Sequence, residues 1–107
     1  MPLPAGQWNV NGNGFTGVLN ISTVDGNGNL AATIYGDQVI GLWDDVSQRI
    51  TFVRLPNPSD PSTAQVWNGY LFSNATLHTL AGSFEGFQGS GSIARRTTYG
   101  WFAQVTA

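Results

Sequence analysis

The chain has 107 residues, no cysteine and a formal net charge of −2, and charged residues make up only 9% of it. This length suits one domain over residues 1–107, and the absence of cysteine excludes disulfides, thiolate metal sites and a cysteine nucleophile. The few basic residues form no stripe for phosphates, so we expect neither a nucleic-acid partner nor an anionic membrane surface as a partner.

Short runs of β-branched and aromatic residues alternate with turn residues along the whole chain. Fourteen glycines are spread over it, and we find no convincing helical periodicity, so the sequence predicts an all-β domain. In chain order, strands are predicted at residues 7–10, 15–24, 30–35, 39–43, 49–55, 63–73, 77–87 and 97–105.

Turn chemistry separates these strands. Asn and Gly at residues 11–14 and 25–29 accept positive φ angles in tight turns. Prolines make residues 56–62 the longest clear loop in the first two thirds of the chain, and residues 88–96 are predicted to be a flexible loop. Within residues 77–87, the two internal glycines are candidate positions for bends or bulges.

Eight sequential strands with mostly short connections favour an antiparallel up-and-down β-barrel, because closure removes the two exposed edges of an open sheet. A β-sandwich is the alternative, although Greek-key sandwiches usually need more long connections than this chain offers.

Several strands carry apolar residues on both faces, which one interior cannot absorb. In residues 39–43, for example, Gly41 shares a face with Trp43, whereas Ile40 and Leu42 point the other way. If Trp43 faces the interior, Ile40 and Leu42 face outward. We therefore predict that an outer apolar patch is buried in a homo-oligomer interface.

Residues 6–9, Gly-Gln-Trp-Asn, place a Gly-x-Trp on the first strand. This pattern resembles the first-strand signature of the calycins, which include lipocalins, fatty-acid-binding proteins and avidins. Residues 67–70, Trp-Asn-Gly-Tyr, are most similar to avidin and streptavidin. The resemblance implies a barrel with a ligand site at its open end and, for avidins, a tetramer. It also implies that Arg95 or Arg96 takes the place of the calycin arginine that packs over the first tryptophan, here Trp8.

Two positions differ from avidins in ways that concern biotin. Avidins have a biotin-contacting Asn two residues after the first tryptophan, where this chain has Val10, and an Asp in the last-strand region, whereas residues 99–105 contain no acid. Leaving a buried polar group of the ligand unpaired costs roughly 1 to 3 kcal/mol. We therefore expect that the chain does not bind biotin tightly.

The four tryptophans lie in four different predicted strands. Aromatic rings either fill a barrel or stack on an apolar or sugar ligand. Trp8 is assigned a structural role. For a ligand site at one end of the barrel we predict a lining of Trp43, Trp67, Tyr70 and Trp101. The scarce cations Arg54, Arg95 and Arg96 are either solvated or available to an anionic group.

No motif indicates catalysis, a cofactor or a metal site. His78 is the only histidine, and proton transfer would require a partner such as Asp44, Ser83 or Glu85 within hydrogen-bond distance. Residues 25–29 resemble the first half of a calcium loop but lack the glycine and glutamate that complete it, so a turn is favoured.

The first four residues lack the charged and apolar regions of a signal peptide, which makes a cytoplasmic location the default expectation. Asn20 and Asn74 begin N-glycosylation triplets, which are frequent by chance in a chain rich in Asn, Ser and Thr.

Three hypotheses about function follow. The first is a non-enzymatic, calycin-like barrel that binds a small apolar or aromatic ligand and forms a homo-oligomer. The second is a carbohydrate-binding or structural oligomeric β module with a filled interior. The third, and least favoured, is an isomerase or hydrolase that uses His78.

Overall fold

The computed structural model is a closed antiparallel β-barrel. It describes residues 1–88 and 95–107, without the side chains of residues 62, 87, 88 and 95. The elements in chain order are β1 (Gly6–Gly12), β2 (Phe15–Val24), β3 (Leu30–Ile34), β4 (Asp37–Asp44), β5 (Arg49–Arg54), the 3₁₀ helix η1 (Pro61–Thr63), β6 (Gln65–Ser73), β7 (Leu77–Gln88) and β8 (Arg95–Thr106).

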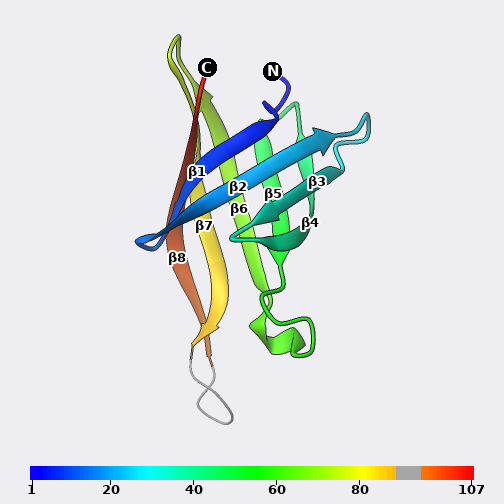
Figure 1. The fold of residues 1–107 in the computed structure, drawn as a ribbon, viewed down its shortest axis with the longest axis vertical. Coiled ribbons are helices and arrows are strands. Elements are labelled where there is room, and N and C mark those ends of the chain that lie inside the picture. Colours follow the sequence, from blue (N-terminus) through cyan, green and yellow to red (C-terminus); the bar gives the residue numbers. More distant parts are fainter. Residues whose placement is uncertain (89–94) are drawn as a thin grey trace.

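Each strand pairs with the next one along the chain, and β8 closes the sheet against β1 (Figure 1). The closing pairs run from Asn9 with Gln104 to Gly12 with Trp101. Because the strands form one closed sheet, each strand has a neighbour on both sides. The predicted up-and-down barrel is confirmed, and the alternative β-sandwich is excluded.

The differences from the predicted strands lie mainly at strand ends. β6 begins at Gln65 rather than at residue 63, because η1 occupies the end of the proline-rich loop, where the Thr63 amide donates to the Asp60 carbonyl at 3.1 Å. The fold remains all-β, with η1 as a single 3₁₀ turn in the described residues. The flexible loop expected at residues 88–96 is shorter, since β7 continues to Gln88 and β8 begins at Arg95. The rest of that expectation, residues 89–94, lies outside the described residues.

Among the described strand pairs, the register shifts once, between β2 and β3 at Ile21 and Thr23. β7 keeps an unbroken register with β8 from Leu77 to Gln88. Gly82 and Gly86 therefore mark no bulge in β7, contrary to the sequence-based expectation.

Side chains alternate between the barrel interior and its outer surface, as the period of two requires. Leu19 and Ile21 on β2, for example, face the interior. The fully buried side chains share this inward orientation and include the aromatic rings of Trp8, Phe52 and Trp67. The barrel therefore has a packed apolar core rather than a channel.

Antiparallel order places alternate connections at the same end of the barrel. We call the end formed by the turns at residues 13–14 and 35–36 and by the connection at residues 55–64 the open end. The opposite end, formed by residues 1–5 and the turns at residues 25–29, 45–48 and 74–76, is the N-terminal end. Both termini lie at the N-terminal end, and η1 lies at the open end (Figure 1). No helix in the described part of the chain is long and apolar enough to cross a membrane.

Candidate functional site

A cavity of about 260 Å³ lies at the open end of the barrel. Its lining comes from strands or turns on all sides of this end: Gly12, Asn13, Phe15, Tyr35, Arg54, Gln65, Trp67, Phe84, Gly86 and Tyr99. Aromatic rings predominate, and Arg54 is the one formally charged residue in this lining. The cavity combines an apolar wall with a few polar groups, as small-molecule sites do.

Tyr35 is held at the edge of this cavity by backbone contacts with β1 and β2. Its hydroxyl donates to the Phe15 carbonyl at 2.6 Å and accepts from the Gly12 amide at 3.1 Å. Gly12 and Gly17 leave space for the ring, because a Cβ at Gly12 would lie 2.9 Å from the Tyr35 hydroxyl and one at Gly17 would overlap the ring. Burial raises the pKa of Tyr35 above its ordinary value of 10.0, so the hydroxyl keeps its proton at neutral pH.

The Arg54 guanidinium contacts three neighbouring side chains at the open end. Its Nε and Nη2 lie 3.0 and 2.8 Å from Oδ2 of Asp37, and its Nη1 donates to Oε1 of Gln65 at 3.2 Å. The same Gln65 oxygen accepts from the Trp67 indole at 3.2 Å. The guanidinium also lies over the Tyr35 ring, 4.9 Å from its centroid. Arg54 is therefore oriented by an acid, an amide and an aromatic face.

Below the cavity, stacked aromatic rings fill the barrel interior. Trp67 lies between Phe52 and Phe84, with ring centroids 5.5 and 4.0 Å apart and both rings within 12° of parallel to the indole. The other side of Phe84 faces Tyr99 at 5.1 Å. Trp101 meets Trp67 edge-on at 5.3 Å and donates to the Asn68 carbonyl at 3.0 Å. This geometry is typical of favourable aromatic packing.

The structure does not bring the four predicted ligand-binding residues together. Trp67 lines the cavity, and Trp101 is buried beside it. Trp43 is buried at the N-terminal end, six residues along β4 from Asp37 at the open end. Tyr70 faces outward and is 48% exposed, so it does not line the interior as predicted. The period of two places Tyr70 on the face opposite to Trp67 and Gly69.

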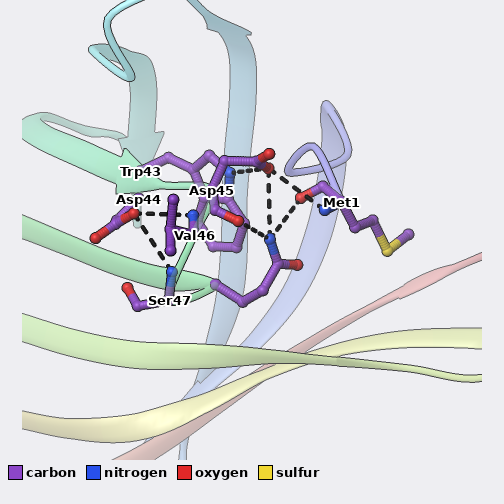
Figure 2. Close-up of polar contacts among 7 residues, drawn as sticks. Met1, Trp43, Asp44, Asp45, Val46 and Ser47 are labelled. Atoms are coloured by element: carbon purple, nitrogen blue, oxygen red, sulfur yellow. Dashed lines mark hydrogen bonds and ion pairs between the residues drawn. The ribbon is translucent and has the colours of Figure 1, made fainter.

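Trp43 belongs to a hydrogen-bonded cluster around the β4 to β5 turn (Figure 2). Its indole donates to Oδ1 of Asp45 at 3.2 Å, and the Gln48 side chain donates to the carbonyls of Met1 at 2.8 Å and Asp45 at 2.6 Å. Beside it, Leu3 is buried in the core. Residues 1–5 thus cover the N-terminal end, and the groove of about 780 Å³ that remains there includes Trp43 and Leu3 in its lining.

Trp8, for which a structural role was predicted, is fully buried. Its indole donates to the Pro4 carbonyl at 3.1 Å, and its ring lies 6.4 Å from that of His78. Arg96 does not pack over it: Arg96 pairs across the strands with Phe87 and lies 3.9 Å from the Glu85 carboxylate. The reason is register, since β1 pairs with residues 101–104 of β8 only. The side chain of Arg95, the other candidate, is outside the described part of the structure.

The contacts of His78 with described residues are to the Ser73 hydroxyl and the Trp8 ring, and neither is a carboxylate. Its Nδ1 lies 2.7 Å from the Ser73 hydroxyl, whereas Ser83 and Glu85, by strand alternation, lie on the opposite face of β7. Asp44 is engaged in its own turn, where it accepts from the Val46 and Ser47 amides, and these bonds lower its pKa. In the described part of the chain, no group of three or more His, Asp or Glu side chains is arranged to hold a metal ion.

Sequence reasoning missed most of the cavity. Arg54 was singled out as a scarce cation, but Tyr35, Gln65, Phe84 and Tyr99 were not proposed as site residues. A signal was present for Tyr35, which ends the third predicted strand directly before a Gly-Asp turn. Nothing local indicated that Arg54 and Asp37 would meet.

Two structures of apo shwanavidin share this architecture. The P21 form aligns over 100% of both chains, with 19% sequence identity and a TM-score of 0.64. The P1 form aligns over 98% of this chain and 99% of that chain, with 18% identity and a TM-score of 0.65. No family model matches the sequence, and no curated protein matches it. Likeness at this identity establishes the fold, and by its fold the chain is an avidin-like eight-stranded β-barrel.

Proposed function

We propose that the chain is a non-enzymatic binding protein that takes a small ligand into the cavity at the open end. The observation that carries this proposal is the cavity of about 260 Å³, whose aromatic wall is interrupted by the oriented guanidinium of Arg54. Trp67 contacts the ligand in this proposal, and Trp101 supports Trp67 from behind. Trp43 is too far along the barrel to share the same ligand.

Tight biotin binding is not part of the proposal. Val10 faces the interior and is buried, as are Trp101 and Ala103 on the last strand. These side chains offer a ureido group no oxygen acceptor, and unpaired buried polar groups cost roughly 1 to 3 kcal/mol each. The interior therefore favours a ligand with less demand for hydrogen bonds than biotin.

A homo-oligomer is the second part of the proposal. Ile40 and Leu42 point outward, as predicted, and Ile40 is 83% exposed. Ile40 pairs across the strands with Val53, which is also exposed. A second group of outward rings lies on β6 and β8, namely Tyr70, Phe72 and Phe102. Apolar patches of this kind support burial against another copy of the chain.

The aromatic stack favours a second candidate function. Because Trp67 and Phe84 are each covered on both faces, most of the interior is filled. A structural oligomeric module needs only such a filled interior and an apolar outer surface. This candidate requires no ligand at either end of the barrel.

A thermal-shift screen separates the two candidates. Biotin, biotin analogues, fatty acids, haem and sugars are each tested, because a ligand that binds only the folded state raises the melting temperature. Gly86→Leu fills the open-end cavity, which Gly86 lines, whereas Gly26→Leu is the matched control in the groove at the N-terminal end.

The binding proposal expects stabilisation by at least one compound, lost in Gly86→Leu and kept in Gly26→Leu. If stabilisation by the compound is lost only in Gly26→Leu, the ligand site lies at the N-terminal end instead. A screen without any stabilising compound would favour the structural module.

A further inference from the structure

The charge of Arg54 is compensated before any ligand enters the cavity. Two nitrogens of its guanidinium lie within 3.0 Å of the Asp37 carboxylate, and the third donates to Oε1 of Gln65. The side chains of Arg54 and Asp37 are 18% and 31% exposed, so this ion pair is only partly screened by solvent. The cavity therefore contains a guanidinium but little net charge to attract an anion.

Apart from the two N–H donors of Arg54 that neither Asp37 nor Gln65 takes, the polar groups that remain for a ligand are uncharged. Three of these groups belong to residues that line the cavity, namely the Tyr99 hydroxyl, the Gln65 side-chain nitrogen and the Asn13 carboxamide. In the described part of the chain, none of these three groups forms a hydrogen bond to another residue, whereas Oε1 of Gln65 accepts two. A ligand with a neutral amide or hydroxyl can pair with such groups without displacing an existing contact.

Charged ligands meet a cost that neutral ones avoid. Asp37 and Gln65 take three of the five N–H donors of Arg54, so a carboxylate finds two donors on a guanidinium whose charge Asp37 already compensates. An ammonium or amidinium finds no carboxylate in the described lining. Burying either ion without a full partner is unfavourable. The aromatic walls, by contrast, suit a flat apolar body.

We infer that the open-end cavity selects small, flat, uncharged aromatic ligands that carry an amide or hydroxyl group, and discriminates against anions and cations of the same shape. This inference rests on the proposed function, because it names the ligand class of the same cavity. The Arg54 and Asp37 pair is the specificity determinant, since it cancels the one formal charge of the described lining.

Three probes of nearly equal shape test the inference: benzamide is neutral, benzoate is anionic and benzamidine is cationic. Binding is followed by amide and indole proton NMR titration of the full chain at neutral pH and about 0.15 M ionic strength. The Trp67 indole and Gly86 amide resonances locate the site. We expect benzamide to bind roughly tenfold more tightly than either charged probe.

Asp37→Asn removes the compensating charge at constant shape. In this variant benzoate should gain roughly fivefold or more in affinity, benzamidine should lose affinity, and benzamide should change by less than about twofold. Glu85→Gln is the matched control, because Glu85 is an exposed carboxylate beside Arg96 and does not line the cavity. It should leave the order of the three probes unchanged.

The outcomes separate the inference from the proposed function. If benzoate or benzamidine binds wild type as tightly as benzamide at the Trp67 resonance, the inference fails while the binding function stands. If no probe binds but a compound of the thermal-shift screen does, the ligand class is again wrong. If no compound binds in either experiment, the proposed function is overturned. Should Asp37→Asn fail to fold, the order of the three probes on wild type still decides.

Discussion

The rings of Trp67 and Phe84 are stacked, with their planes 9° from parallel and their centroids 4.0 Å apart. The two residues are cross-strand partners on β6 and β7. Both line the cavity at the open end. This pair of rings is thus both the last layer of the core toward the open end and the inner wall of the candidate site.

Removing one ring of this pair should be costly. We expect Phe84→Ala to lower the free energy of unfolding by roughly 3 to 5 kcal/mol, because it removes a buried ring and leaves a cavity beside Trp67. Urea denaturation followed by circular dichroism measures the loss. The control is Val46→Ala, whose side chain is 96% exposed in the β4 to β5 turn, and it should cost less than about 1 kcal/mol. Equal losses in the two variants would contradict the role of the stack.

Gly17 should tolerate no side chain, because a Cβ there would overlap the ring of Tyr35. We expect Gly17→Ala to lower the free energy of unfolding by roughly 1 to 3 kcal/mol, as overpacking does, and to weaken any ligand bound beside Tyr35. Gly26→Ala provides the comparison, since nothing lies within 4 Å of a Cβ at Gly26. The prediction is wrong if the two alanine variants have the same urea midpoint.

The outward rings should determine the oligomeric state. Phe102 on β8 and Tyr70 on β6 both pair across the strands with Ala81, so their rings flank one outer position of β7. A charge placed there must be desolvated in an interface, so we expect Phe102→Asp to reduce the sedimentation coefficient to that of a monomer. Val46→Asp adds the same charge at a turn residue that is 96% exposed, and it should leave the oligomer intact. If the wild-type chain is strictly monomeric at micromolar concentration, the proposed interface is ruled out.

Acid should weaken the turn between β2 and β3. The Asp25 carboxylate accepts from the Asn29 side chain at 3.0 Å and from the Asn27 and Asn29 amides at 2.8 and 2.9 Å, and these bonds, led by the Asn29 side chain, lower its pKa below 3.8. On acidification the Asp25 carboxylate is therefore protonated at a higher pH in the unfolded chain than in the folded one. Its contribution to the free energy of unfolding is present above pH 3.8 and is lost as the pH falls through the lower folded-state pKa.

Asp25→Asn isolates this contribution. The variant should have a lower urea midpoint than wild type at neutral pH, and the difference should shrink as the pH falls below 3.8. A difference that stays constant or grows at acid pH would show that the turn does not depend on the charge of Asp25.

Much of the fold was predictable from local features of the chain. The Asn- and Gly-rich turns and the runs of β-branched and aromatic residues indicated eight strands in the correct order, and alternation placed Ile40 and Leu42 on the face opposite to Trp43. These properties are local because successive residues of an extended strand point to opposite faces regardless of the strand's neighbours. Tyr70 was assigned to the ligand site in spite of this rule, which places it on the face opposite to Trp67.

What the sequence by itself determined is therefore the strand order, the turns and the inward or outward direction of most side chains. Only the tertiary structure decided how far along the barrel each side chain lies, since that position depends on the register of several strand pairs. Register separated Trp43 from Trp67, kept Arg96 away from Trp8, and brought Arg54 within 3.0 Å of Asp37, which is 17 residues away in sequence. The candidate cavity is the product of those long-range pairings, and for that physical reason it could not be read from any single stretch of the chain.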